Sequence, residues 1–382
     1  MDPKELLSNC RAIFEESIKK FGNGGASLGI LKDGKSDYLE LGTETTMPNE
    51  NTVHLTSSMT KSILAVAIGM LVSSGKIRLD TPVKDIIQLR ATCNHRSGAP
   101  LRVVDLLDHR SEFFSEPDFR NTRNYSNLGY ALLAMIIEEK AGMSWTEFLH
   151  TKVFDPLGMT RSTADMSCRK PEGNIADSYC AQINGQELRD LLGDDEDSAA
   201  VHERFLCRVK ASNLVAVAQP LQLSKCSDTA TYIGAAAGIR STVSDLLKFY
   251  QACIELFNER PDRELTEFEA GAIVVLDHIR EMAQDRTCAY AGGWNPVSLP
   301  WDQKQRAPGA DGENYGRLRA VADLNTSGRS SMGMLTNWVD SWHGSTAVTW
   351  LELLRLSSSS PRCAWLWWLC AVQGASMSTV RT

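Results

Sequence analysis

The stretch HLTSSMTKSILAVAIGML, residues 54–71, decides how the rest of the chain is interpreted. Its first part is polar and its second part is almost entirely apolar, which predicts a buried helix from Lys61 to Leu71. Ser58 and Lys61 are three residues apart, so on a helix they share one face and the amine can reach the hydroxyl. The helix N-terminus also offers unpaired backbone N–H groups and the positive end of a dipole. This arrangement suits a serine nucleophile with a lysine beside it.

The same residues have a second interpretation, in which Ser58 caps the helix and Lys61 is solvated in its first turn. In the first interpretation, the apolar neighbours bury the lysine. Burial lowers the pKa of an amine, which could then accept a proton near neutral pH. The motif alone does not separate these two interpretations.

Other short patterns of this kind occur in the chain. S-x-x-K also occurs at Ser17–Lys20, on the polar side of an expected helix, and at Ser73–Lys76, in the Ser-Ser-Gly end of the apolar helix. G-x-S-x-G occurs at residues 25–29. A nucleophile elbow requires a strand before the serine and a helix after it. Because the residues after Ser27 are strand-like, we expect Ser27 to lie at the start of a strand.

The composition excludes several classes of protein. The chain has 382 residues, 43% hydrophobic and 23% charged, which is ordinary for a globular protein of one large domain or two medium ones. A formal net charge of −7 gives no basic footprint, so we expect no nucleic-acid partner. No apolar run approaches the roughly 18 residues of a membrane-spanning helix, so we expect no membrane partner.

The cysteines and the N-terminus indicate a compartment. The 10 cysteines form no CxxC pair, which argues against a zinc site and against a dense disulfide framework. The first residues carry charges throughout and have no apolar core of a secretory signal. We therefore expect a cytoplasmic protein with free thiols.

Further elements follow from periodicity and turn residues. Apolar residues recur at helical spacing over residues 2–21, 128–140, 146–153 and 243–256. Two strand-like runs flank Asp33-Gly34, which predicts a hairpin. From Ala289 onward, short apolar runs with Gly and Trp predict strands.

Residues 54–71 resemble the S-x-T-K helix of the serine β-lactamase-like family. This family includes class C β-lactamases, D-alanyl-D-alanine carboxypeptidases, esterases and fungal acyltransferases of the lovastatin type. Three later stretches resemble further segments in the family's order: VVDLLDHRSEF (103–113), NYSNLGYALLAMIIEEKAGMSWTEFLHTKVFDPLGMTRS (124–162) and AAAGIRSTVSDLLKFYQA (235–252). Their occurrence in order, spanning roughly residues 10 to 345, is specific.

The resemblance implies roles for individual residues. Ser58 would be the acylated nucleophile and Lys61 its general base or proton partner. Tyr125 would activate Ser58 or protonate the leaving group, and Asn127 would orient Lys61 or the substrate amide. Which of Lys61 and Tyr125 takes the first proton is open.

The family closes its site with a strand carrying K-T-G, H-x-G or a similar motif. Its counterpart here is Trp342-His343-Gly344-Ser345-Thr346, so His343, Gly344 and Ser345 are expected on the oxyanion side. Glu112 stands where the family has a glycine, in a turn near the site, and we interpret it as variation.

The resemblance implies an α/β fold of the β-lactamase/transpeptidase-like type. An antiparallel sheet would be flanked by helices, with an inserted all-helical lobe at roughly residues 80–230. The catalytic domain would comprise residues 1–346. Residues 347–382 are rich in Ser, Trp and Leu and depart from the family pattern. We interpret them as an atypical tail and hypothesise that it is not native to the fold. If the tail is genuine, we expect the sheet to lack its final strand and helix.

The function implied is that of a serine hydrolase or acyltransferase with an acyl-enzyme intermediate. The partners would be a small-molecule acyl donor (an ester, thioester or amide) and a small acceptor, in tailoring reactions of secondary metabolism. No metal or organic cofactor is implied. Two alternatives stay open: a non-catalytic binding protein that kept the scaffold, and a true β-lactamase or peptidase.

Overall fold

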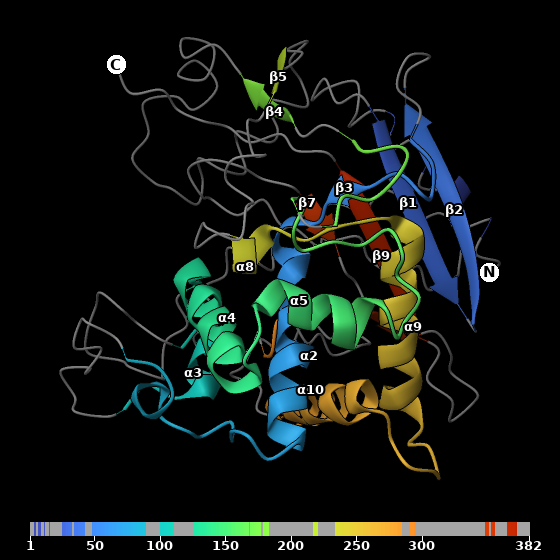
Figure 1. Cartoon of the computed structure of the whole chain (residues 1–382). Helices are drawn as coiled ribbons and strands as arrows, with labels where there is room; N and C mark the ends of the chain where they lie inside the picture. The colour runs from blue at the N-terminus through green and yellow to red at the C-terminus, as the bar shows by residue number, and fades with distance from the viewer. Residues whose placement is uncertain are drawn as a thin grey trace, which may run out of the picture.

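Figure 1 shows the chain in a computed structural model. Apart from isolated positions before residue 25, the structure describes residues 25–32, 34–42, 48–88, 100–110, 125–167, 169–176, 179–182, 217–220, 234–284, 291–294, 348–350, 353–355 and 365–372. The helix predicted for residues 2–21 lies almost wholly outside this set, as do most of the strands predicted after Ala289.

A hairpin begins the antiparallel sheet. Strands β1 (Gly25–Lys32) and β2 (Lys35–Gly42) pair with Lys32 opposite Lys35. Gly34 in the turn has a φ of +73°, a left-handed conformation that glycine adopts without strain. The hairpin predicted from Asp33-Gly34 is therefore confirmed.

Strand β9 (Trp365–Val372) lies on the other side of β1 and pairs with it antiparallel. It also pairs antiparallel with the short strands β7 (Val348–Trp350) and β8 (Leu353–Arg355), which gives the order β2-β1-β9-β7. In the part of the chain that the structure describes, the sheet thus does not stop at residue 346. The segment after this residue contributes β7, β8 and β9 to the sheet, whereas a sheet without its final strand was expected for a genuine tail. That the tail is not native to the fold stays a prediction.

Helix α9 (Val243–Asn258) packs against β1 and β9, two neighbouring strands inside the sheet (Figure 1). Helix α2 (Thr60–Ser73) runs through the middle of the molecule and is buried along nearly its whole length. Helix α10 (Glu267–Gln284) crosses it closely. The antiparallel sheet with packed helices confirms the predicted fold class.

The remaining helices pack around α2 and α4 (Asn127–Ala141). They are α3 (Val103–Leu107), α5 (Trp145–Leu149) with its continuation η3 (His150–Phe154), and α8 (Gly234–Ala237). Short elements complete the described chain: η1 (Ser57–Met59), η2 (Val83–Asp85), and the pair β3 (His54–Leu55) and β6 (Arg240–Ser241).

Two differences from the expected elements stand out. Strands β4 (Tyr179–Gln182) and β5 (Val217–Pro220) pair with each other inside residues 80–230, so this region is not all-helical as predicted. Helix α10 was not predicted. Its apolar residues nevertheless recur at helical spacing at Phe268, Ala272, Val275 and Leu276, and all four are buried.

No helix in the described part of the chain combines the length and the apolar character needed to cross a membrane.

Candidate active site

Ser58 lies in η1, immediately before α2, and its residue is exposed. The turn that carries it is tied to the segment between α8 and β6. The N–H and the Oγ1 hydroxyl of Thr56 both donate to the carbonyl of Ile239, at 2.9 and 2.8 Å. The N–H of Ile239 donates back to Thr60 Oγ1 at 3.2 Å. The hydroxyl of Ser58 is therefore presented to solvent from a turn that is anchored on both sides.

Lys61 lies one helical turn after Ser58 and is completely buried. Its Nζ lies 3.1 Å from Ser58 Oγ, 2.9 Å from Asn127 Oδ1 and 2.9 Å from the carbonyl of Ala236. The alternative of a solvated lysine in the first turn is therefore wrong. The amine is held by oxygens from η1, α4 and α8, three elements far apart in sequence.

Tyr125 reaches the same hydroxyl from a different part of the chain. Its phenol donates to Ser58 Oγ at 2.7 Å, and its ring centroid lies 4.7 Å from Lys61 Nζ. Ser126 caps α4 by accepting from the N–H of Gly129. Asn127, the next residue, bonds Lys61. Three consecutive residues thus connect the start of α4 to both members of the Ser58–Lys61 pair.

The turn after α3 supports Tyr125 from behind. The His109 ring lies 4.3 Å from the Tyr125 ring, centroid to centroid. His109 Nδ1 accepts from the backbone N–H of Ser126 at 3.1 Å. Because Nδ1 accepts this bond, it carries no proton, and the neutral ring has its proton on Nε2. The LLDHR segment thus positions the tyrosine that the YSN segment supplies.

Two residues next to the site have backbone strain. Among the residues that the structure describes, only Ser57 (φ +49°) and His109 (φ +55°) are non-glycine residues with a positive φ. A non-glycine residue with this backbone conformation lowers the stability of the fold by about 1 kcal/mol or more. The conformation persists only where the surrounding contacts enforce it. Ser57 precedes Ser58, and His109 contacts Tyr125. The strain in the described chain is therefore placed on the two residues that set the Ser58–Tyr125 geometry.

Ser27, the serine of the G-x-S-x-G pattern, has a different environment. It lies within β1, is fully buried, and is followed by strand and hairpin rather than helix. Its hydroxyl donates to the carbonyl of Asn49 at 3.0 Å and lies 3.1 Å from His54 Nε2. The imidazole therefore donates from Nε2, and burial lowers the pKa of His54 to about 4. These contacts exclude the elbow interpretation.

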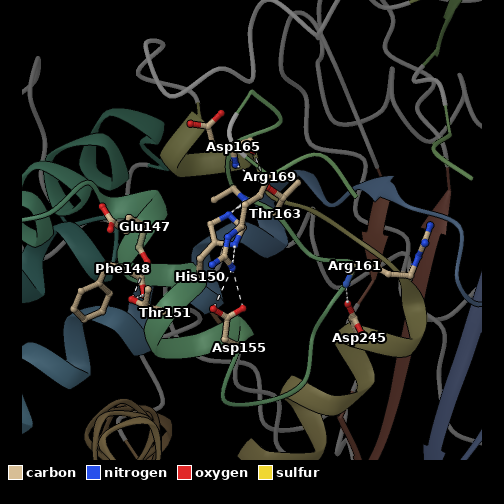
Figure 2. Close-up of polar contacts among 11 residues, drawn as sticks. Glu147, Phe148, His150, Thr151, Asp155, Arg161, Thr163, Asp165, Arg169 and Asp245 are labelled. Carbon is tan, nitrogen blue, oxygen red and sulfur yellow. Dashed lines mark hydrogen bonds and ion pairs between the residues drawn. The ribbon is translucent and has the colours of Figure 1, made fainter. Parts of the chain in front are cut away.

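A second polar cluster braces the segment that supplies Ala236 (Figure 2). Thr163 and Arg240 exchange backbone hydrogen bonds, and Thr163 Oγ1 lies 3.2 Å from His150 Nε2. Figure 2 shows Arg169 between His150 and Asp155: it reaches His150 Nδ1 at 3.3 Å and forms an ion pair with Asp155 at 2.9 Å. Burial, assisted by the Arg169 charge, lowers the pKa of His150 to about 4. The cluster is structural and holds β6 in place.

The structure brings Ser58, Lys61, Tyr125 and Asn127 together, as predicted. His343, Gly344 and Ser345 lie outside the described residues, as does Glu112. Two contributors were missed in the sequence. The Ala236 carbonyl has no side-chain signature, although its AAAGIRS segment was noted. His109 was noted only as part of a motif, and its contact with Tyr125 could not be read from sequence spacing.

Comparisons with known proteins agree with this architecture. The family model described as Beta-lactamase matches residues 11–352. Penicillin-binding protein 4 of Amycolatopsis lactamdurans is 26% identical over 168 residues, which cover 36% of this chain and 44% of that protein. Penicillin-binding protein 4* of Bacillus subtilis is 29% identical over 161 residues, covering 35% of each. The aligned region thus spans less than half the length of these curated relatives.

A solved structure shares the fold. The β-lactamase from Sulfitobacter sp. EE-36 superposes with a TM-score of 0.54 at 18% identity, covering 79% of this chain and 76% of that one. This likeness concerns the fold alone. Since the family model covers most of the sequence, and since the S-x-x-K helix and the Y-x-N segment meet in one site, the chain belongs to the Beta-lactamase family.

Proposed function

We propose that the protein is a serine hydrolase or acyltransferase that forms an acyl-enzyme on Ser58. The observation that carries the proposal is the convergence on Ser58 Oγ of an amine at 3.1 Å and a phenol at 2.7 Å. Both distances are within hydrogen-bond reach of the proton that must leave the hydroxyl. Ser58 is also exposed, so an acyl donor can approach it.

Lys61 is the proposed first base. In the neutral form an amine has two N–H groups and one lone pair. The carbonyl oxygens of Asn127 and Ala236 accept the two hydrogens, which leaves the lone pair directed toward Ser58 Oγ. Lys61 takes the proton of Ser58 as the oxygen attacks the acyl carbon. The same three partners then accept the three hydrogens of the resulting ammonium.

Tyr125 is the proposed proton donor. Its phenol already donates to Ser58 Oγ at 2.7 Å, so it lies beside the atom that bonds the acyl carbon when the tetrahedral intermediate collapses. The Lys61 ammonium, 4.7 Å from the ring centroid, stabilises the phenolate that remains after the leaving group has taken the phenol proton. In deacylation the phenolate takes the proton of the attacking water or acceptor, and Lys61 returns its proton to Ser58 Oγ, which lies 3.1 Å away. Water, or the hydroxyl or amine of an acceptor, then releases the acyl group. The backbone N–H groups at the start of α2 supply part of the oxyanion site.

The proposed substrates are small-molecule esters, thioesters or amides, and transfer to a small acceptor in secondary metabolism is one form of the reaction. Support for acyl chemistry comes from the family and from the names of the relatives, which describe penicillin binding and β-lactamase. A fluorescent penicillin is therefore a rational first probe beside simple activated esters.

The test is pre-steady-state hydrolysis of a p-nitrophenyl ester, with intact-protein mass measured during turnover. We expect a burst of one nitrophenol per protein and a mass increase of one acyl group. Ser58→Ala should abolish both. Ser73→Ala is the matched control, because Ser73 belongs to another S-x-x-K pattern but lies at the exposed end of α2. A folded wild-type protein with neither burst nor adduct would instead favour a non-catalytic binding protein.

A further inference from the structure

Asp108 and His278 form a buried pair just behind the strained His109 turn. His278 Nε2 lies 3.0 Å from both carboxylate oxygens of Asp108, and the side chains are 9% and 2% exposed, respectively. Asp108 Oδ1 also accepts from the N–H of Gly292 at 3.0 Å. One carboxylate therefore ties the end of α3 to α10 and to the turn at residues 291–294.

One member of this pair, Asp108, is the sequence neighbour of His109, whose ring contacts Tyr125. Asp108 precedes His109 in sequence, and His109 has a φ of +55°. The strained backbone directs the His109 ring to the Tyr125 ring at 4.3 Å and its Nδ1 to the N–H of Ser126. The Asp108 carboxylate fixes the residue before His109, and the Arg110 N–H donates to the Asp105 carbonyl at 2.8 Å on the other side of the turn. These anchors hold His109 at a positive φ against the negative φ that an L-residue prefers.

We propose that His278, through its hydrogen bonds to Asp108, is a positioning residue that keeps the His109 turn in its strained conformation and so holds the Tyr125 phenol against Ser58. The inference rests on the proposed function, and it places a residue of α10 among those that determine the position of Tyr125. His278 touches no reacting atom. Its effect travels through Asp108, the backbone of His109 and the ring contact with Tyr125.

A double-mutant cycle separates this role from simple loss of stability. The readout is the second-order rate constant for labelling of Ser58 by a fluorophosphonate, for wild type, His278→Ala, Tyr125→Phe and the double variant. Displacing a reacting group by about 1 Å can cost on the order of 100-fold, so His278→Ala should slow labelling at least about tenfold. In the Tyr125→Phe background the same change should matter less than about twofold, because the hydroxyl it positions is gone.

Two further variants keep the test decisive. His278→Gln places an amide donor near the position of Nε2 and should restore most of the wild-type rate. Asp277→Asn is the matched control: the neighbouring residue on α10 is exposed, and its ion pairs with Arg260 and Arg280 lie on the surface. It should label at the wild-type rate. Should His278→Ala fail to fold, Asp108→Asn takes its place in the cycle.

Equal slowing by His278→Ala in both backgrounds would overturn the inference, as would an unchanged rate in the wild-type background. Wild-type protein that is not labelled at all would instead overturn the proposed function. The two failures are therefore distinguishable.

Discussion

The side chain of Lys61 is fully buried where α2, α4 and α8 meet, and its amine contacts oxygens of Ser58, Asn127 and Ala236. These three oxygens are uncharged. A lysine in such a position is costly to maintain, and a buried ionisable group of this kind is a marker of function. At the scale of single residues, the site is thus recognised by what surrounds the amine.

Lys61→Met tests the role of this amine. Methionine has similar length and no branch, so the core around α2 should remain packed. Labelling of Ser58 by a fluorophosphonate should slow about 100-fold or more, since general-base catalysis contributes roughly 10²–10⁴-fold. Lys76→Met, in the exposed S-x-x-K pattern at the end of α2, is the control and should have no effect. A rate for Lys61→Met within about threefold of wild type would contradict the role.

The buried His54 predicts a pH dependence of stability. Burial lowers its pKa to about 4 in the folded protein, against about 6.5 in an unfolded chain. As pH falls from 6.5 toward 4, the unfolded state binds a proton that the native state does not. The free energy of unfolding therefore decreases over this range, by up to about 3 kcal/mol from this residue.

The measurement is urea unfolding of wild type and His54→Gln at pH 7.5 and pH 4. The glutamine can still donate to Ser27, and it does not titrate. Relative to wild type, it should gain stability at the lower pH. His150→Gln should show the same trend, since the pKa of His150 is also about 4. A stability difference between wild type and His54→Gln that does not change with pH would refute this assignment.

Much of the residue-level site could be predicted from the sequence. Ser58 and Lys61 are three residues apart, so a local pattern places them together, and the resemblance added Tyr125 and Asn127. The pattern could not supply Ala236 or His278. A backbone carbonyl leaves no mark in the sequence, and the contact of His278 with Asp108 joins positions 170 residues apart.

At the scale of elements, α2 and α10 make the closest contact between two helices near the site. A Cβ on Gly69 would lie 2.2 Å from the carbonyl oxygen of Gly271, and a Cβ on Gly271 would lie 2.6 Å from the backbone nitrogen of Met70. Only glycines allow this approach. The contact fixes α10, and with it His278, against the helix that carries Lys61.

Gly271→Ala should separate the two helices. The nearest atom, Met70 Cγ at 2.2 Å, can move aside, but Met70 N at 2.6 Å and Met70 Cα at 2.8 Å are backbone atoms that cannot rotate away. We therefore expect a loss of about 1–3 kcal/mol in the free energy of unfolding. Urea denaturation measures it as a lower midpoint. Glu281→Ala, at an exposed position on the same helix, should change stability by less than about 0.5 kcal/mol. Equal midpoints for wild type and Gly271→Ala would show that the helices do not pack this closely.

Element boundaries also show where sequence reasoning succeeds. The uninterrupted apolar run predicted a helix from Lys61 to Leu71, and α2 runs from Thr60 to Ser73. The bounds agree closely because a helix that is buried on all sides is apolar along its whole length. The predicted helix at residues 146–153 was found as α5 and η3. Helix α10 was missed although its periodicity is clear. Its partner α2 lies some 200 residues earlier, and local patterns do not reveal pairing.

At the scale of the whole molecule, the site depends on segments from across the chain. The nucleophile turn is held by residues near 239, Tyr125 by the turn after α3, and that turn by α10. The antiparallel sheet includes β9, close to the end of the sequence, beside β1, near its beginning. Three strands of this sheet, β7, β8 and β9, thus come from the segment after residue 346, where the family pattern is no longer recognisable. Composition and lost motif similarity do not determine whether a segment can pair with a strand.

The most direct test of the account is to react the protein with a fluorophosphonate and to locate the adduct by intact mass and peptide mapping. The account predicts one adduct per chain, on Ser58, and none in Ser58→Ala. An adduct on any other residue, or equal labelling of Ser58→Ala, would contradict the claim that Lys61 and Tyr125 converge on Ser58 to activate it.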